Sequence, residues 1–376
     1  MEYKLLKNIA QITMGQSPDS SSYNEEEKGL PFYQGNADFG ELYPTARVWC
    51  DAPKKIASEG DILISVRAPI GALNYASEDC CIGRGLAAIT IKNEAEKNYV
   101  YHLLKARKTD LNSKGTGSTF KAIGKSVLEE VQVPVISREQ QEISMQLMDT
   151  IENVIRQRKK ELRLLDELVK ARFVEMFGDA IHNDRDWETD TVDNVCNEIY
   201  GGGTPSKAHP EYYEDGNIPW VSSKDMKTDV LTDSQIKINH LGIENSTAKL
   251  VPVNSVIMVI RSGILKHTLP VAINTVPITV NQDLKVFIPN DRIITRFLAV
   301  QFKLHEKDIL SGVRAVTADN IEFNSLKQRT LIVPPIELQQ EYVEFAVQVD
   351  KSKAAVQKSL DETQMLFDSL MQKYFG

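Results

Sequence analysis

Two arginines stand at matching places in the two halves of the chain, and both could contact a nucleic acid. Arg67 ends the strand-like run 60–67, and Arg261 ends the strand-like run 254–261. A guanidinium at the end of a strand can bind a phosphate, or it can donate two hydrogen bonds to the acceptor edge of guanine. A salt bridge within the unit would use the same side chain for folding alone. The sequence leaves both interpretations open.

A further arginine, Arg84, lies between Gly83 and Gly85. Glycines on both sides would let DNA or another backbone approach closely. The counterpart of Arg84 in the second half is Gln282, another residue type that commonly contacts bases. An arginine that serves only to shape a turn remains the alternative.

Two glycine-containing loops carry hydroxyl and basic side chains. In the first half, Lys114 and Lys121 flank a segment that holds Ser118 and Thr119. Side chains of these types commonly contact phosphate oxygens rather than bases. A solvated loop is the alternative, and we favour the contact with DNA. The analogous loop of the second half contains Arg314, the contact that we expect there.

Polar residues also follow an aromatic motif in each half. The motifs are Pro-Phe at 31–32 and Pro-Trp at 219–220, and we expect their rings to anchor the core rather than stack on bases. The polar residues after them are candidates to contact bases. The predicted DNA-contacting residues are, in full, Gln34, Asn36, Arg67, Arg84, Lys114, Ser118, Thr119, Lys121, Thr204, Lys207, Ser222, Ser223, Lys224, Arg261, Lys266, Gln282, Arg314 and Thr317.

These candidates match in pairs because the chain contains an internal repeat. Six segments of the first half return about 190 to 200 residues later, in the same order. Two examples are MGQSP at 14–18, which matches GGTPS at 202–206, and the two Gln-Gln-Glu segments at 140–142 and 339–341. One such match would carry little weight, whereas six in order indicate a duplication. We therefore expect two copies of one structural unit.

Each copy changes character part-way along. Short β-branched runs, turns and a short helical segment come first, which predicts an α/β (α+β) globular unit. A turn-free stretch of about 40 residues follows, just after prolines that end the preceding strand. We expect globular units at 1–136 and 181–336, and long helices at 137–180 and 337–376.

Apolar residues in the turn-free stretches repeat at alternating three- and four-residue steps, as in a coiled coil. Helices of this length are marginal alone and need a partner that buries the apolar seam. Because the chain returns through the second globular unit, we expect the helices to pair antiparallel, in a dumbbell of pseudo-twofold symmetry. The predicted seam consists of Leu147, Ile151, Val154, Leu165, Leu168, Tyr342, Phe345, Val349, Val356, Leu360, Phe367 and Leu370.

The order of globular unit, long helix, globular unit, long helix resembles the specificity subunits of type I restriction–modification systems. The segments MGQSP at 14–18, SVRAPIG at 65–71 and CIGRGL at 81–86 are similar to the first target-recognition domain of such subunits. The segment VPPIELQQ at 333–340 is similar to the boundary before the family's spacer helix. The first half departs from this pattern, with Val135 in place of the second proline.

This resemblance implies a non-catalytic, cytoplasmic subunit that recognises a two-part sequence in double-stranded DNA. The implied partners are two modification subunits and the restriction subunits of the same system. The modification subunits would use S-adenosylmethionine to methylate adenine, and the restriction subunits would use ATP and magnesium to translocate and cut DNA. No cofactor and no metal is expected in this chain itself.

The residues themselves give no sign of an enzyme. The sequence contains neither a G-x-x-x-x-G-K-[ST] phosphate loop nor the Asn/Asp-Pro-Pro-aromatic segment of a methyltransferase, and its cysteines and histidines lack metal-ligand spacing. It also has no apolar run of about 18 residues that would predict a membrane span. The net charge of −8 is unusual for a DNA-binding protein, so we expect a local basic surface. A coiled-coil scaffold that binds other proteins is the alternative; it would explain the acidity, but not the matching arginines and glycine turns.

Overall fold

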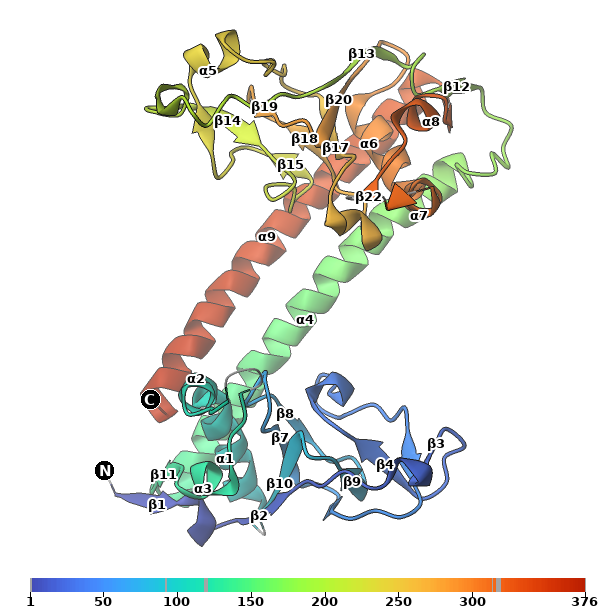
Figure 1. Ribbon diagram of the computed structural model, residues 1–376. Coiled ribbons are helices and arrows are strands. Elements are labelled where there is room, and N and C mark those ends of the chain that lie inside the picture. Colours follow the sequence, from blue (N-terminus) through green and yellow to red (C-terminus); the bar gives the residue numbers. More distant parts are fainter. Residues whose placement is uncertain (1, 92, 118–120, 313, 316–318, 376) are drawn as a thin grey trace. The chain divides into compact units, whose positions relative to one another are not determined.

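The computed structural model describes residues 2–91, 93–117, 121–312, 314–315 and 319–375. Two compact units make up the chain, Met1–Glu161 with Val356–Gly376 and Leu162–Ala355. Two helices of 40 residues each, α4 (Arg138–Phe177) and α9 (Ile336–Phe375), contribute one segment to each unit (Figure 1). The division between the units therefore falls inside the two helices, so that each unit includes a part of both.

The first unit is built on two small sheets. A four-stranded antiparallel sheet has the order β2-β10-β7-β8, and a five-stranded sheet has the order β3-β5-β4-β9-β6. Strands β7 and β10 are apolar along almost their whole length, because they are buried on both faces. A ribbon of β1 and β11 completes the unit. The bounds are β1 (Tyr3–Leu5), β2 (Gln11–Met14), β3 (Tyr23–Asn24), β4 (Leu30–Tyr33), β5 (Trp49–Cys50), β6 (Ile56–Ala57), β7 (Ile62–Ser65), β8 (Leu73–Tyr75), β9 (Cys80–Ile82), β10 (Leu86–Thr90) and β11 (Gln132–Pro134).

The second unit has a five-stranded sheet in the order β13-β20-β17-β18-β15 and a three-stranded sheet in the order β16-β14-β19. A ribbon of β12 and β23 takes the place of β1 and β11. The bounds are β12 (Thr189–Thr191), β13 (Cys196–Gly201), β14 (Ile218–Val221), β15 (Val230–Leu231), β16 (Lys237–Ile238), β17 (Val256–Val259), β18 (Val271–Asn274), β19 (Thr279–Val280), β20 (Leu284–Pro289), β21 (Arg314–Ala315), β22 (Asp319–Asn320) and β23 (Thr330–Ile332).

The two units repeat the same strand pairing. In the first unit β4 runs parallel to β9, with Tyr33 opposite Ile82. In the second unit β14 runs parallel to β19, with Val221 opposite Val280. Four neighbouring strands of each unit also pair antiparallel in an equivalent order, which is β2-β10-β7-β8 in the first unit and β13-β20-β17-β18 in the second. The mixed α/β duplication predicted from the sequence is therefore confirmed.

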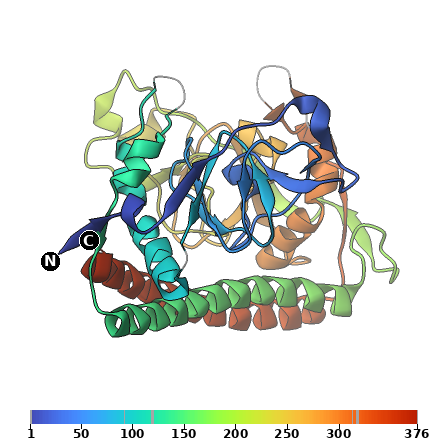
Figure 2. The ribbon, with the colours of Figure 1, turned by 90° about the horizontal axis from the view of Figure 1, so that it is seen from below.

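Helix α1 (Glu94–Ala106) packs against the long-helix segments of the first unit, as Figures 1 and 2 show. The Nζ of Lys105 lies 2.5 Å from Oε1 of Glu152 on α4 and 5.4 Å from the ring centroid of Phe367 on α9. The rings of Tyr99 and Phe375 meet at 5.1 Å. The remaining short helices are α2 (Lys108–Ser113), α3 (Lys125–Glu129), α5 (His240–Glu244), α6 (Thr295–Leu304), α7 (Glu306–Ser311) and α8 (Phe323–Lys327).

In the second unit, an aromatic cluster holds the two long-helix segments against α6. Phe173 and Phe177 of α4 pack on Phe297 of α6 and on Tyr342 of α9, with ring centroids 5.0–6.1 Å apart. All four side chains are fully buried in the main core of this unit. Within this unit the helices are antiparallel, since α4 residues 166 and 172 form ion pairs with α9 residues 353 and 341 in the reverse order.

The predicted seam corresponds to buried positions on α9 better than on α4. On α9, Phe345 and Leu370 are half-buried, and the other predicted positions are buried: Tyr342, Val349, Val356, Leu360 and Phe367. On α4, Ile151 is buried, and Val154 and Leu165 are half-buried.

The assignment of Leu147 and Leu168 was wrong, because these side chains are 37% and 45% exposed. The more buried positions lie one residue further along, at Met148 and Val169. Helix α4 carries apolar residues beside its buried seam as well as in it. Two neighbouring series of residues therefore fit the heptad spacing, and the spacing alone does not decide which series is buried. Among the described residues, no helix is both long and apolar enough to cross a membrane.

Candidate nucleic-acid interface

Four of the predicted contact residues surround one hollow in the first unit. Gln34 follows β4, Asn36 begins a short 3-10 helix, Arg67 comes two residues after β7, and Arg84 comes two residues after β9. Together they line a depression of about 230 Å³, which we call the first-unit hollow. Because β4 and β9 are parallel neighbours, the turns that follow them lie at the same edge of the sheet. This places residues far apart in the sequence around one concave surface.

A carboxylate and a glycine fix the backbone of this hollow. Oδ2 of Asp38 accepts hydrogen bonds from the backbone N–H groups of Gln34 at 2.8 Å and Gly35 at 3.3 Å, which shapes the turn after β4. Gly85 packs directly beneath this turn, and a Cβ atom at residue 85 would lie 2.3 Å from the carbonyl oxygen of Gln34. A side chain at residue 85 would therefore push the two turns apart.

The basic side chains of the hollow are exposed and form no ion pair within the described part of the chain. Neither Arg67 nor Arg84 forms a side-chain hydrogen bond or an ion pair with any residue in the described part of the chain. Lys121 lies beside them, because the N–H of Ala68 donates to the carbonyl oxygen of Lys121 at 3.1 Å. The side chain of Lys121 is also exposed and forms no ion pair with a described residue. Three cationic groups that pair with no described residue are thus placed to bind an anion or an electron-rich base edge.

The second unit has the same backbone arrangement at the equivalent place. The N–H of Val66 donates to the carbonyl oxygen of Gly85 at 2.9 Å, and Ile260 donates to Asp283 at 2.9 Å. Ala68 donates to Lys121 at 3.1 Å, and Ser262 donates to Asp319 at 3.1 Å. These matched hydrogen bonds make four positions equivalent, so that Arg67, Arg84, Gly85 and Lys121 correspond to Arg261, Gln282, Asp283 and Asp319.

The side chains at these equivalent positions differ in charge and in pairing. Nε of Arg261 lies 3.0 Å from Oδ1 of Asp283, so in the second unit this arginine forms an intramolecular salt bridge. Lys266 pairs loosely with Asp319, at 3.8 Å. The hydroxyl of Thr204 donates to the side-chain oxygen of Gln282, which joins two of the predicted residues.

The residues after the Pro-Trp motif serve two purposes. Ser222 is part of a turn, since its N–H and hydroxyl both donate to Oδ2 of Asp225, at 2.9 and 2.7 Å. Ser223 and Lys224 instead line a large cleft of about 900 Å³ within the second unit, which we call the second-unit cleft. Lys227 lines the same cleft, although the sequence analysis did not select it.

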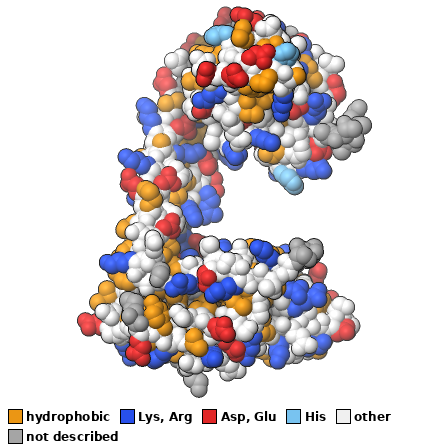
Figure 3. Space-filling model, turned by 60° about the vertical axis from the view of Figure 1, so that its left-hand side comes forward, with side chains coloured by type: hydrophobic (Ala, Val, Ile, Leu, Met, Phe, Trp, Pro, Cys, Tyr) orange, Lys and Arg blue, Asp and Glu red, His pale blue; other side chains and the backbone are white. Residues whose placement is uncertain are grey.

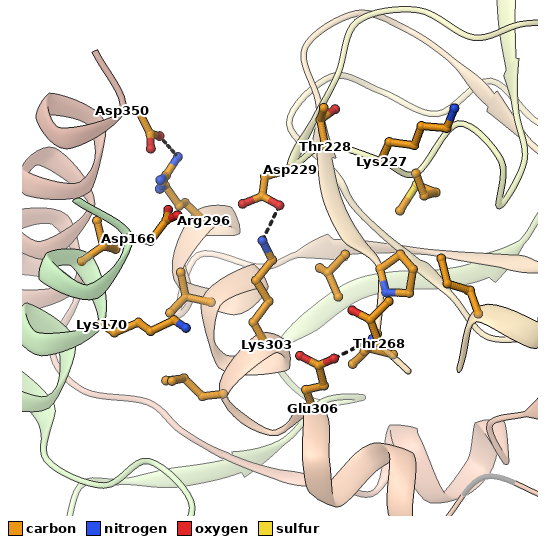
Figure 4. Close-up of a pocket in the computed structure, with 18 of the residues that line it drawn as sticks. Asp166, Lys170, Lys227, Thr228, Asp229, Thr268, Arg296, Lys303, Glu306 and Asp350 are labelled. Atoms are coloured by element: carbon orange, nitrogen blue, oxygen red, sulfur yellow. Dashed lines mark hydrogen bonds and ion pairs between the residues drawn. The ribbon is translucent and has the colours of Figure 1, made fainter. Parts of the chain in front are cut away.

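Ion pairs neutralise much of the second-unit cleft. Arg296 lies 2.6 Å from Asp350, and Lys303 lies 2.5 Å from Asp229 (Figure 4). Lys170 of α4 also lines the cleft and forms no ion pair with any described residue. The same is true of Lys224 and Lys227 in the loop after β14. The cleft therefore keeps a modest positive charge around an interior with several apolar side chains.

The other candidates fall into three groups. Lys114 pairs with Asp110 one turn earlier in α2, at 2.9 Å, and Lys207 is exposed without an ion pair to a described residue. The backbone of Arg314 pairs with Asn320, and its side chain lies outside the described residues. Ser118, Thr119 and Thr317 also lie outside them.

The sequence analysis missed the two carboxylates that set the charge of the second unit, Asp283 and Asp319. A signal for Asp283 was present, since it follows Gln282 directly as Gly85 follows Arg84. Asp319 gave no such signal, because its equivalence to Lys121 rests on a backbone hydrogen bond.

Charged residues of both signs cover the surfaces of the two units, and Figure 3 shows Lys and Arg side chains gathered in patches among acidic ones. A net charge of −8 is therefore compatible with local basic surfaces. Burial raises the pKa of the Cys80 thiol to about 12 and that of Cys81 to about 11, so both thiols are protonated and weakly reactive at neutral pH. Among the described residues, no group of three His, Cys, Asp or Glu side chains could hold a metal ion.

Comparison with known proteins agrees with this duplicated arrangement. The model of the type I restriction modification DNA specificity domain matches residues 1–164 and again residues 184–363. The chain belongs to this family.

Two relatives are similar to this chain over different lengths, one over less than half of it and one over almost all of it. A putative type I restriction enzyme MjaX specificity subunit from Methanocaldococcus jannaschii is 41% identical over 160 residues, which cover 42% of this chain and 38% of that protein. The match thus spans about two fifths of that relative. The type I restriction enzyme MjaIX specificity subunit of the same organism is 23% identical over 403 residues, covering 99% of this chain and 92% of that subunit.

One solved structure is similar in fold to this chain over its whole length. The crystal structure of a type-I restriction-modification system S subunit from M. genitalium superposes with a TM-score of 0.61 and covers 100% of this chain and 96% of that one. Its sequence identity is 13%, so this likeness concerns the fold alone.

Proposed function

We propose that the chain is the specificity subunit of a type I restriction–modification complex and recognises a two-part DNA sequence, one part with each unit. The observation that carries this proposal is the repeat of one backbone arrangement in both units, with polar and basic side chains of the predicted type at its exposed edge. In the first unit these side chains surround a hollow, and membership in the DNA specificity family supports the same conclusion.

The subunit itself would be non-catalytic and would act in the cytoplasm. Two modification subunits would carry S-adenosylmethionine and methylate adenine, and restriction subunits would use ATP and magnesium to translocate and cut DNA. Long helices suit this role, because a helix rises by about 1.5 Å per residue and a paired helix resists bending. The helices would then set the number of base pairs between the two recognised parts.

The test is to express the chain together with its methyltransferase partner in a host that lacks other adenine methylation, and to sequence the methylated adenines. We expect a two-part motif with a fixed gap. Removal of seven residues from α4 and the seven facing residues from α9 would shorten the pair by about 10 Å, or roughly three base pairs, and should change the gap while leaving both parts unchanged.

The control is the methyltransferase expressed without this chain, which should give no motif. If the methylation pattern does not depend on this chain, the DNA-binding proposal fails, and the coiled-coil scaffold for other proteins takes its place. A changed sequence in one of the two parts after the helix deletion would argue that the helices do more than set the gap.

A further inference from the structure

The first-unit hollow differs from its equivalent in the second unit at two positions that decide its charge. Where the first unit has Gly85, the second has Asp283, and where the first has Lys121, the second has Asp319. The first unit therefore has no carboxylate at these two positions, whereas in the second unit Asp283 pairs with Arg261 and Asp319 pairs with Lys266. Because the backbone is the same, this difference comes from side chains alone.

The chemistry of the first-unit hollow matches the acceptor edge of guanine. In the major groove guanine offers two acceptors, N7 and O6, which a guanidinium binds with two parallel hydrogen bonds. The guanidinium groups of Arg67 and Arg84 line the hollow and pair with no described side chain, and the amides of Gln34 and Asn36 line it too. Guanidinium and amide groups also bind phosphates, but two guanidiniums and two amides around one concave surface supply the donors and acceptors that the edge of a base pair requires.

The equivalent place in the second unit is less suited to guanine. Gln282 replaces Arg84, and its side-chain oxygen already accepts from Thr204. The carboxylate of Asp283 holds Nε of Arg261 and adds a negatively charged acceptor beside this arginine. Acceptors that face one another repel, so a carboxylate at this edge disfavours the N7 and O6 acceptors of guanine.

We propose that the first-unit hollow is a guanine-recognition site, formed chiefly by Arg67 and Arg84, and that the equivalent place in the second unit does not favour guanine. This inference rests on the proposed function, since it assigns a base to one of the two recognised parts. We therefore expect the part of the DNA sequence bound by the first unit to contain a guanine. The preference for guanine at that position should depend on these two arginines.

The experiment is a selection from a library of random duplexes by the full chain in complex with its modification subunits, read out by sequencing. The key variant is Arg84→Gln, which introduces the residue that the second unit carries naturally at the same backbone position and so should fold. We expect Arg84→Gln or Arg67→Ala to reduce the preference for one guanine by about ten- to a hundredfold, with the other part of the motif unchanged. The matched control, Arg261→Ala, should leave that guanine preference intact.

The outcomes separate this inference from the proposed function. If Arg84→Gln and Arg67→Ala weaken binding to all duplexes equally, the arginines contact phosphates and the guanine assignment is wrong, although sequence-specific binding stands. If the preference for guanine is lost with Arg261→Ala instead, the assignment to the first unit is wrong. If the unaltered complex selects no motif at all, the proposed function fails, and this inference fails with it.

Discussion

Phe177 fixes the end of α4 to the core of the second unit, so Phe177→Ala should destabilise this unit strongly. Its side chain is 0% exposed, and its ring centroid lies 5.0 Å from those of Phe173 and Phe297 and 5.8 Å from that of Tyr342. Truncation of a buried phenylalanine costs about 3–5 kcal/mol. Each aromatic pair contributes about 0.5–1.5 kcal/mol beyond its buried area, so we expect a loss at the upper end of that range, about 4–5 kcal/mol.

The assay is urea unfolding of the full chain, followed by tryptophan fluorescence. Trp187 is a suitable reporter, because its ring lies 6.2 Å from that of Phe177 and its Nε1–H donates to the carbonyl oxygen of Phe177 at 2.9 Å. In a thermal scan the same loss should lower the Tm of a unit of this size by roughly 10–20 °C.

Val174→Ala is the matched control for Phe177→Ala. It removes an apolar side chain from the same helix, one turn earlier, at a position that is 55% exposed. Its effect should stay within about 0.5 kcal/mol. If Phe177→Ala costs less than about 1 kcal/mol, or no more than Val174→Ala, then α4 is not held on the second unit by this aromatic cluster.

Three further predictions concern backbone packing, pH and DNA. Gly202→Ala would place Cβ 1.8 Å from a backbone carbonyl oxygen, so it should destabilise the second unit by at least about 1–3 kcal/mol. In the control, Gly263→Ala, the added Cβ has nothing within 4 Å, so the Tm should not change. Equal effects of the two substitutions would contradict the packing argument. Burial and the nearby arginine lower the pKa of His305 below its usual 6.5, so the unfolded chain binds a proton more readily, and the free energy of unfolding should fall as the pH drops below about 6.5. His305→Leu should flatten this dependence in urea titrations between pH 5 and pH 8 (about the range in which histidine titrates), and an unchanged slope would assign it to another group. If the proposed function holds, Lys121→Ala should weaken binding to all duplexes alike and reduce the slope of log K against log salt concentration by about 0.9, whereas a loss confined to one sequence would assign Lys121 to a base.

The duplicated fold could be predicted from the sequence because backbone requirements leave strong marks. Gly15 and Gly202 stand at equivalent places, and a Cβ atom at either would lie about 2 Å from a carbonyl oxygen of the neighbouring strand connection, at 2.1 and 1.8 Å. Such a position tolerates little besides glycine, so both copies retain it. The long helices were predictable for a similar reason, since a seam of apolar residues at heptad spacing is visible without knowledge of its partner.

The exact seam of α4 could not be predicted in the same way. Ile143, Leu164 and Val174 are 52–57% exposed although they are apolar, so burial on this helix does not follow from residue type. Only the packing of α4 against α9 and each unit decides which of two adjacent apolar residues is covered.

Whether each candidate arginine forms a salt bridge could not be predicted from the sequence either, because it depends on which residue the fold places next to the guanidinium group. Arg67 and Arg261 end equivalent strands, yet one is unpaired among the described residues and the other lies 3.0 Å from a carboxylate. One substitution between the copies, Asp283 at the position of Gly85, accounts for this difference, and Asp319 at the position of Lys121 pairs with Lys266 instead. The hydrogen bonds that make these positions equivalent join backbone atoms only, so they are the same whatever the side chain. A frame held by backbone hydrogen bonds can therefore keep its geometry in both copies while the charge at its exposed edge changes, which is what two units need if they are to recognise different halves of one DNA sequence.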